Sequence, residues 1–442
     1  MEPSSSRRLS TAASVALAAV LFAIPRSLHA APLHGEISGA GSNRTPIAVV
    51  RLAPISAPEP ALEEEFRRIV ADDLEISGLY KVVDPASYIE GVPPGPLGPE
   101  HVNFLNWQAV GARGVVLGHY EKTGSDLAVE VAYLDVGAHS MVGGKRFRGP
   151  ASDVARMAHR TADAVMEFTT GTPGPFDSRI AFVSNRGGFA KEINVFTFDG
   201  EITRVTNHHT VTMAPSWSVD SGSIVFTSFR GGAPSLYSVT LAGRAEKQLA
   251  TKMGVNVGGA WKPDGSSLAL AREEGGNTDI YLLNFASQEQ KRLTDHWGID
   301  VDPAWNPDGS RLAFCSSRGG TPQVYTMAPS PGSEATRITF GGSYNCAPSW
   351  SPDGHWIAYA GRVGRDFHIF IVPATGGEPR QLTFTGSNED PTWSPDSRYV
   401  VFAREAGGDR KLYLVDLTGR WERELTTGKG DDSSPSWSKR LD

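Results

Sequence analysis

The chain has 442 residues, of which 40% are hydrophobic and 21% are charged, as in ordinary globular proteins. Its length is enough for two or three domains, each with a buried core. The formal net charge of −7 gives no reason to expect nucleic-acid binding, which normally needs a basic surface. The 48 glycines and 30 prolines favour a fold with many turns, which is typical of β structure.

The first 31 residues have the features of a secretory signal peptide. Arg7 and Arg8 precede a mostly apolar stretch of sixteen residues, Leu9–Ile24, and a polar segment follows that ends on the small residues Ala30 and Ala31. A helix that spans a bilayer needs about 20 apolar residues, so this stretch is too short to be a membrane anchor. We therefore expect cleavage after Ala30 or Ala31, export of the mature chain and no direct membrane insertion.

The next part of the chain predicts a small α/β domain that follows a Gly/Ser-rich strap of residues 32–45. Residues 61–77 predict an amphipathic helix, because Leu62, Phe66 and Leu74 share one face and Gly78 ends the pattern. Apolar or alternating runs predict the other elements: strands at 45–50, 80–84, 114–121, 127–136 and 141–148, and helices at 102–110 and 153–168. The predicted domain spans residues 46–170, and residues 171–176 (GTPGPF) are the predicted linker.

Tryptophan recurs in one context through the rest of the chain. Six tryptophans, each after a Pro-x or Gly-Ala pair, occur at intervals of 43 to 45 residues: Trp217, Trp261, Trp305, Trp350, Trp393 and Trp437. In one such repeat the strand ending at Trp350 is followed by a Pro-Asp-Gly turn, apolar strands at 356–359 and 368–371, and a short strand at 380–383. Four short strands in about 44 residues are typical of one blade of a β-propeller.

The two ends of this repeat region are out of phase. The earliest segment that matches the second strand of a repeat begins near Ile180, and no tryptophan strand precedes it. At the other end, no second strand follows Trp437. Joined together, the two ends complete one blade, with SSPSWS (433–438) as its inner strand and residues 178–206 as its outer three. This closure replaces a weak seam with backbone hydrogen bonds. The predicted fold class is therefore α+β multidomain, with a small α/β domain followed by an all-β six-bladed β-propeller over residues 177–442.

Sequence motifs of catalysis are missing. There is no G-x-S-x-G, no HExxH, no phosphate-binding glycine loop and no EF-hand loop. His208, His209 and His296 lack a third ligand at metal spacing and are interpreted as loop residues, and His159 as a packing or capping residue. Five aspartates follow the tryptophan strands at the same point, and we interpret them as turn caps: Asp220, Asp264, Asp308, Asp353 and Asp396.

Cys315 and Cys346 are the only cysteines of the chain, so there is no CxxC site for zinc or thiol chemistry. Export would allow the two to form a disulfide. We favour two buried thiols over this alternative.

Because the sequence shows no catalytic motif and no metal-binding motif, the candidate functional site is a surface formed by loops of the propeller. The loops that lead into the innermost strands (the lead-in loops) and the loops between second and third strands are expected on one face, around the mouth of the central channel. The lead-in loops carry apolar residues such as Val211, Ile299 and Tyr344, and the second set carries Arg186 and Arg318. Variable loops that combine apolar residues with arginine on a rigid scaffold suit protein recognition.

Taken together, these features resemble the TolB family of the Tol-Pal system. In the N-terminal domain the resemblance lies in PIAVV (46–50), in IVADDLEISGLY (69–80), and in the spacing of Arg156, His159 and Asp163 before FDSRIA (176–181). In the propeller it includes all six tryptophan units. The resemblance implies a non-enzymatic adaptor of the periplasm, expected to be a monomer without cofactor or metal. It also implies a role in outer-membrane integrity and in invagination of the outer membrane during cell division.

The resemblance further implies two binding sites for partners. The lipoprotein Pal, with other outer-membrane lipoproteins as further candidates, would bind at the channel mouth through Val211, Thr212, Val255, Asn256, Ile299, Asp300, Val301, Tyr344, Asn345, Asn388 and Glu389. The protein TolA would bind the strap through Glu36, Ile37, Ser38, Gly39 and Arg44. Two alternatives stay open: an exported propeller that binds a glycan or small ligand, and a propeller hydrolase or lyase that uses acids of the channel.

Overall fold

The structure is a computed structural model that describes residues 44–55, 57–93, 95–186, 188, 190–249 and 256–441. The predicted signal peptide and the strap residues Glu36, Ile37, Ser38 and Gly39 lie outside these ranges. Within them, the helices are too short or too polar to cross a membrane.

The N-terminal domain is a mixed sheet with helices on both faces. The strands follow the order β3–β1–β4–β5–β6, with β2 beside β4. β1 is parallel to β3 and β4, and the remaining neighbours are antiparallel except for the short β2. The strands are β1 (Thr45–Val49), β2 (Ala53–Pro54), β3 (Tyr80–Val82), β4 (Gly114–Thr123), β5 (Asp126–Asp135) and β6 (Ser140–Pro150).

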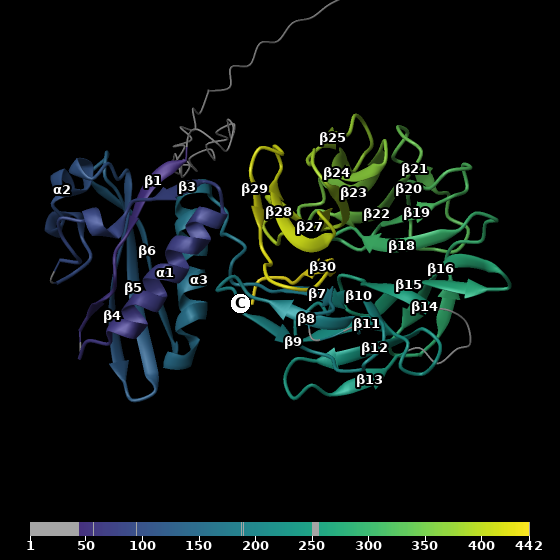
Figure 1. Ribbon diagram of the computed structural model, residues 1–442, viewed down its shortest axis with the longest axis horizontal. Coiled ribbons are helices and arrows are strands. Elements are labelled where there is room, and N and C mark those ends of the chain that lie inside the picture. Colours follow the sequence, from purple (N-terminus) through teal and green to yellow (C-terminus); the bar gives the residue numbers. More distant parts are fainter. Residues whose placement is uncertain are drawn as a thin grey trace, which may run out of the picture. The chain divides into compact units, whose positions relative to one another are not determined.

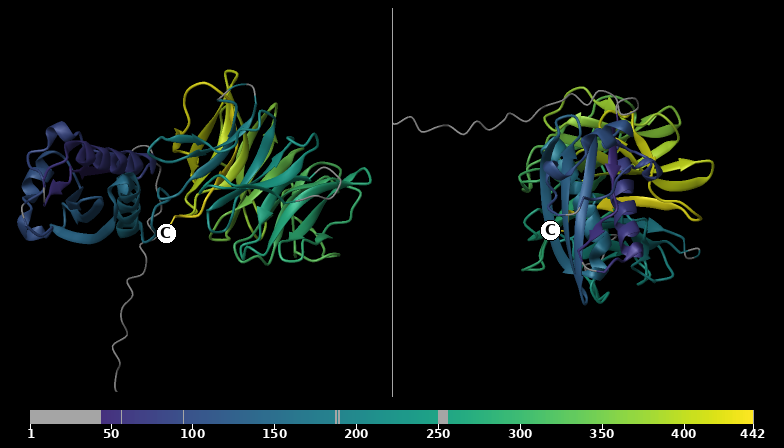
Figure 2. Two further views of the ribbon diagram at one scale, coloured as in Figure 1. Left: turned by 90° about the horizontal axis from the view of Figure 1, so that it is seen from below. Right: turned by 90° about the vertical axis from the view of Figure 1, so that its left-hand side faces the viewer.

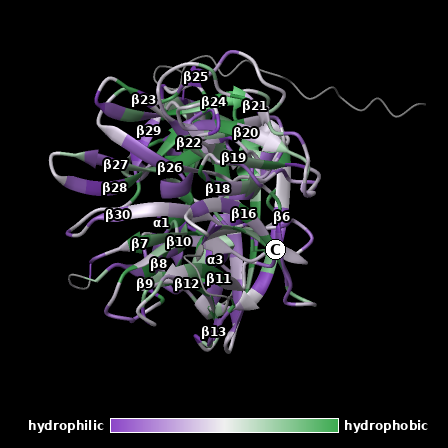
Figure 3. Ribbon diagram, turned by 90° about the vertical axis from the view of Figure 1, so that its right-hand side faces the viewer, coloured by the Kyte–Doolittle hydropathy of each residue, from purple (hydrophilic) through white to green (hydrophobic). Residues whose placement is uncertain are grey.

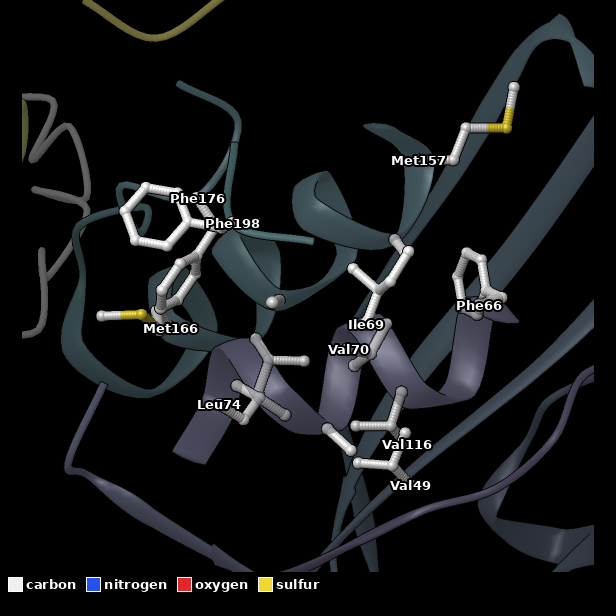
Figure 4. Packing of buried hydrophobic residues seen from close by; sticks show 14 of the residues in the cluster. Val49, Phe66, Ile69, Val70, Leu74, Val116, Met157, Met166, Phe176 and Phe198 are labelled. Carbon is white, nitrogen blue, oxygen red and sulfur yellow. The ribbon is translucent and has the colours of Figure 1, made fainter. Parts of the chain in front are cut away.

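The two long helices of this domain, α1 (Pro60–Ile76) and α3 (Val154–Thr170), lie side by side on one face of the sheet (Figures 1 and 2). Phe66 and Leu74 of α1 are buried against Val49 and Val116 of the sheet (Figure 4). The opposite face is covered by α2 (Phe104–Ala109), which buries Trp107. Short 3₁₀ turns occur at Pro85–Ser87, Pro99–His101 and Ala151–Asp153. The predicted helix and strand pattern is therefore confirmed.

The rest of the chain forms six four-stranded antiparallel sheets, which follow one another around a ring (Figure 3). From the innermost strand outward, the first three are β10–β13 (Thr212–Trp217, Ser223–Ser228, Ser235–Thr240, Glu246–Gln248), β14–β17 (Asn256–Trp261, Ser267–Glu274, Asn277–Asn284, Gln290–Arg292) and β18–β21 (Asp300–Trp305, Leu312–Ser316, Gln323–Met327, Thr336–Arg337). The others are β22–β25 (Asn345–Trp350, Trp356–Val363, Asp366–Pro373, Arg380–Gln381), β26–β29 (Ser387–Trp393, Tyr399–Ala406, Asp409–Asp416, Glu422–Glu424) and β30 with β7–β9 (Asp432–Trp437, Ile180–Ser184, Glu192–Phe196, Ile202–Arg204). The chain is a six-bladed propeller, as predicted.

The last sheet joins the two ends of the repeat region. β30 pairs with β7 in a register that places Trp437 opposite Ile180, and the Ser438 amide donates to the Arg179 carbonyl at 2.8 Å. The Trp437 indole donates to Ser178 Oγ at 2.7 Å. Because these bonds link residues more than 250 positions apart, the ring is closed by backbone pairing. The predicted closure by the C-terminal strand is confirmed.

The turn between the two innermost strands is the same in five sheets. In each turn an aspartate accepts the backbone N–H of the residue two positions later at 2.7–3.2 Å. These aspartates are Asp220, Asp264, Asp308, Asp353 and Asp396. This confirms their interpretation as turn caps.

Cys315 on β19 and Cys346 on β22 form a disulfide between neighbouring sheets. Our expectation of two buried thiols is therefore wrong. The spacing of 31 residues could not reveal the pairing, since it depends on how closely the second strand of one blade approaches the first strand of the next.

Hydrogen bonds also join the helices of the N-terminal domain to the propeller. Asp163 of α3 accepts the backbone N–H groups of Phe176 and Asp177 at 2.8 and 3.0 Å, and Arg156 pairs with the Asp177 carboxylate at 3.0 Å. At the end of α1, the Trp421 indole donates to the Ile76 carbonyl at 3.1 Å. The residues that enter the propeller are thus held by α3.

Candidate functional site

The lead-in loops and the loops between second and third strands lie together, as predicted. The Phe229 amide donates to the Val211 carbonyl at 3.1 Å, the Ser317 amide to the Ile299 carbonyl at 3.1 Å, and the Arg362 amide to the Tyr344 carbonyl at 2.9 Å. We call this face of the propeller, made by the two sets of loops, the mouth face.

The predicted binding residues divide into buried and exposed groups. Thr212 and Asp300, which begin β10 and β18, and Asn388 are fully buried, and Asn345 is nearly so. Val211 and Ile299, one position earlier, are 40% and 54% exposed. The partly exposed residues are Val301, Tyr344 and Glu389. Val255 and the side chain of Asn256 lie outside the described part of the chain.

The buried group holds the mouth loops in place. Asn345 donates to Gln323 Oε1 at 2.8 Å and to the Gly341 carbonyl at 2.6 Å. Asn388 donates to the Thr385 and Gly386 carbonyls at 3.0 Å and accepts from Arg404 Nε at 2.7 Å. A partner could not touch these side chains without first displacing the loops, so their role is to fix the surface.

Asp300 shows the same arrangement with charged groups. Its carboxylate accepts from Ser316 Oγ at 2.5 Å and from Arg318 Nη2 at 2.8 Å. Burial raises the pKa of Asp300, although Ser316 and Arg318 oppose this shift. Asp432 repeats the arrangement in the closing sheet, with Ser184 and Arg186 as donors. The arginines predicted to bind a partner are therefore engaged within the protein.

Three exposed aromatic residues of the lead-in loops were missed by the sequence analysis. Trp297, Phe340 and Phe384 are 72%, 71% and 64% exposed. The available signal was their position: Phe340 and Phe384 follow the motif Ile/Leu-Thr, where Asn207, Asp295 and Thr427 stand in other repeats. An apolar residue at a loop position that is otherwise polar is a sign of a binding surface.

The central channel contains a cavity of about 850 Å³. At one level of its wall each innermost strand has a residue with positive φ, between 48° and 69°, where the register with the second strand shifts: Ala214, Gly258, Asp302, Ala347, Asp390 and Ser434. Although Asp302 stays accessible to the channel, the surrounding walls and the nearby charge of Asp390 raise its pKa to about 6. Asp390 accepts from Ser434 Oγ at 2.9 Å.

The histidines of the propeller loops contact neighbouring polar groups. His208 contacts Glu246 at 2.9 Å and Ser228 at 3.1 Å, as a polar loop residue would. Among the described residues, no group of three or more His, Cys, Asp or Glu side chains is arranged to hold a metal ion. His159 contacts Asp73 at 2.7 Å in the core between α1 and α3, consistent with its interpretation as a packing residue.

Arg44 is the predicted strap residue that the structure describes. Its guanidinium lies over the Trp421 ring at 5.1 Å, and the following Thr45 amide donates to the Leu79 carbonyl. Arg44 therefore lies beside Trp421, at the junction of the two domains.

Two family models match the chain. The TolB beta propeller domain matches residues 166–441, and the TolB amino-terminal domain matches residues 34–142. The chain belongs to the TolB family. The TolB propeller match alone includes more than half of the chain and contains the closing strand β30.

Individual TolB proteins agree with this assignment. The chain is 38% identical over 192 residues to the Tol-Pal system protein TolB of Syntrophotalea carbinolica, which is 43% of this chain and 44% of that protein. It is 35% identical over 227 residues to the TolB of Nitrosomonas europaea, which is 51% of each. The matched stretches thus span about half the length of these relatives. The crystal structure of TolB from Acinetobacter baumannii is similar over 91% of this chain and 99% of that chain, with a TM-score of 0.79 and 27% identity.

Proposed function

We propose that the protein is a non-enzymatic adaptor of the periplasm that binds the lipoprotein Pal through the mouth face and TolA through the strap. Other outer-membrane lipoproteins are further candidate partners. The adaptor would support outer-membrane integrity and the invagination of the outer membrane during cell division. The observation that carries the proposal is that both domains match the family of a Tol-Pal component.

The mouth face supports protein binding in its chemistry. Val211 and Ile299 are exposed apolar residues on loops whose backbones are bonded to neighbouring loops. Such loops lose little conformational freedom when a partner binds, so more of the contact energy appears as affinity. In this proposal the buried residues hold the loops: Thr212, Asp300, Asn345 and Asn388. The more exposed residues contact the partner: Val211, Ile299, Val301, Tyr344 and Glu389.

The test is calorimetric titration of the purified mature protein with Pal of the same organism. We expect binding, and we expect Ile299→Asp to weaken it at least about tenfold, because a charge would be buried in an apolar contact. Leu105→Asp is the matched control, since Leu105 is 68% exposed on α2 in the other domain. Failure of the unaltered protein to bind Pal would overturn the proposal and favour a small ligand or glycan in the channel cavity.

The proposed TolA site has a separate test. Deletion of residues 32–43 should abolish TolA binding and leave Pal binding within about twofold, because Arg44, the described end of the strap, lies over Trp421 and not at the mouth loops. A deletion variant that binds TolA like the full chain would contradict the strap assignment.

A further inference from the structure

The three exposed aromatic residues lie on successive sheets of the ring. Trp297 precedes β18, Phe340 precedes β22 and Phe384 precedes β26, and these three innermost strands are neighbours. Figure 3 shows the sheets β18–β21, β22–β25 and β26–β29 in succession. We call Trp297, Phe340 and Phe384 the aromatic rim.

The loops that carry the aromatic rim are fixed by hydrogen bonds. Beside Trp297, Asn277 Nδ2 donates to the His296 carbonyl at 2.6 Å and the Gly298 amide donates to His296 Nδ1 at 3.0 Å. Asn345 Nδ2 donates to the carbonyl of Gly341, which follows Phe340, at 2.6 Å, and the Arg337 guanidinium lies 5.2 Å from the centre of the Phe340 ring. Asn388 binds the two carbonyls that follow Phe384. The rings are therefore presented on ordered backbone, as pre-formed contact residues require.

The other side of the mouth face lacks exposed aromatic residues where it is described, although Val211 is 40% exposed there. Before β10, the position that matches Phe340 is Asn207, followed by His208, which is engaged with Glu246 and Arg230. Before β30, the matching residue is Thr427. The lead-in loop before β14 lies outside the described residues. Within the described loops, exposed aromatic surface is thus confined to three successive blades.

The size of the exposed surface suits a protein partner. A fully buried aromatic side chain covers about 150–250 Å², so three that are about 70% exposed offer roughly 400 Å². A stable interface buries about 800 Å² on each partner. The rim, together with Ile299 and Tyr344, could provide the apolar centre of such an interface, and aromatic residues are frequent among those that dominate binding energy.

We infer that the partner docks off-centre, over the sheets β18–β29, and that the aromatic rim provides its main contacts. The occupant is a folded protein domain with an apolar surface that receives the three rings. This inference rests on the proposed function and takes that domain to be the one that binds the mouth face, the lipoprotein Pal. The residues that determine specificity are then Trp297, Phe340 and Phe384, which are not among the channel-mouth residues that the sequence predicted, such as Val211 and Thr212.

The test compares two triple variants of the full mature chain. The rim variant carries Trp297→Ser, Phe340→Ser and Phe384→Ser. The control carries Ile55→Ser, Ile89→Ser and Leu105→Ser, whose side chains are 65%, 59% and 68% exposed in the N-terminal domain. Calorimetry with Pal should give a Kd at least about 100-fold weaker for the rim variant and within about twofold for the control. Melting temperatures of both should stay near that of the unaltered protein, because all six side chains are exposed.

The outcomes separate the inference from the proposed function. If the unaltered protein binds Pal and the rim variant binds equally well, the inference is wrong and the proposed function stands. If the unaltered protein does not bind Pal, both fail. If sedimentation shows the unaltered protein to be a dimer that the rim variant abolishes, the rim is a self-association surface and the inference is also overturned.

Discussion

The two ends of the innermost propeller strands differ in how their residues are used. At the tryptophan end, turns are capped by aspartates, the Trp437 indole is bonded to Ser178, and Asp177 is held by Arg156 of the N-terminal domain. At the mouth end, polar residues such as Asn388 are buried, and apolar ones such as Phe384 are exposed. One end of the propeller is therefore held by hydrogen bonds and ion pairs within the protein, whereas the other end presents contact surface.

The largest effect is expected from removing the closing strand. Truncation before Pro435 removes half of β30, together with the Trp437 indole, from the sheet that β30 forms with β7–β9. Loss of a buried tryptophan costs about 3–5 kcal/mol, and the open seam adds to it, so the melting temperature should fall by more than about 10 °C. Circular dichroism melting measures it, with removal of residues 440–442 as the control. Equal melting of the two truncations would show that the tryptophan end is not fastened by closure.

A second prediction concerns the junction of the domains. Gly78 has a φ of +71°, and a Cβ there would lie 2.6 Å from the Trp421 ring. Gly78→Ala should therefore cost about 2–4 kcal/mol, from backbone strain and from displacement of the indole. Gly171→Ala is the matched control, because its φ is +80° and nothing lies within 4 Å of an added Cβ. It should cost only about 1 kcal/mol in urea unfolding. Similar costs for the two variants would mean that Trp421 is free to move.

A third prediction separates anchoring from contact at the mouth. Asn388→Ala removes the groups that hold the Phe384 loop and leaves Arg404 Nε without its acceptor, which costs about 1–3 kcal/mol. Pal binding should weaken about tenfold, because the loop is no longer pre-formed. Asn284 caps the turn between β16 and β17, at the end of that sheet away from the mouth. Asn284→Ala should therefore leave Pal binding unchanged in the same titration. Equal binding by both variants would contradict the role of the buried residues.

The smallest effect concerns pH. Burial raises the pKa of Asp163 to about 7, more than the N–H groups of Asp177 and Phe176 lower it, whereas the ordinary value is 3.8. Between these values the folded state binds a proton that the unfolded chain has released, so this group makes stability fall as pH rises from about 4 to about 7. Asp163→Asn should flatten this part of the profile in urea unfolding, whereas Asp126→Asn, on the exposed start of β5, should not. A parallel profile for Asp163→Asn would contradict the shift.

The sequence predicted the fastened end far better than the mouth. Trp350 and the Pro-Asp-Gly turn after it recur in fixed phase, so blade number and closure followed from spacing. Near the mouth, each innermost strand shifts register between residues such as Val301 and Ala304. Period-two alternation therefore cannot tell which side chains point inward, and Asp300 was expected at the surface but is buried.

Residues that occur in only some repeats were also missed. The aromatic rim is present in three blades, and the disulfide of Cys315 and Cys346 in one pair of blades. A repeat identifies what all blades share, which is their packing. The features that make one blade different from another, and so carry specificity, occur in only some blades and cannot be found from the repeat alone.

The central claim is that a partner binds the mouth face of the propeller and does not cover the turns at the tryptophan end. Hydrogen–deuterium exchange of the mature chain with and without Pal tests it most directly. We predict slower exchange on binding in the loops 296–299, 340–344 and 384–389, and no change in the turns 262–266 and 351–355. Slower exchange confined to those turns, with the mouth loops unchanged, would contradict the account.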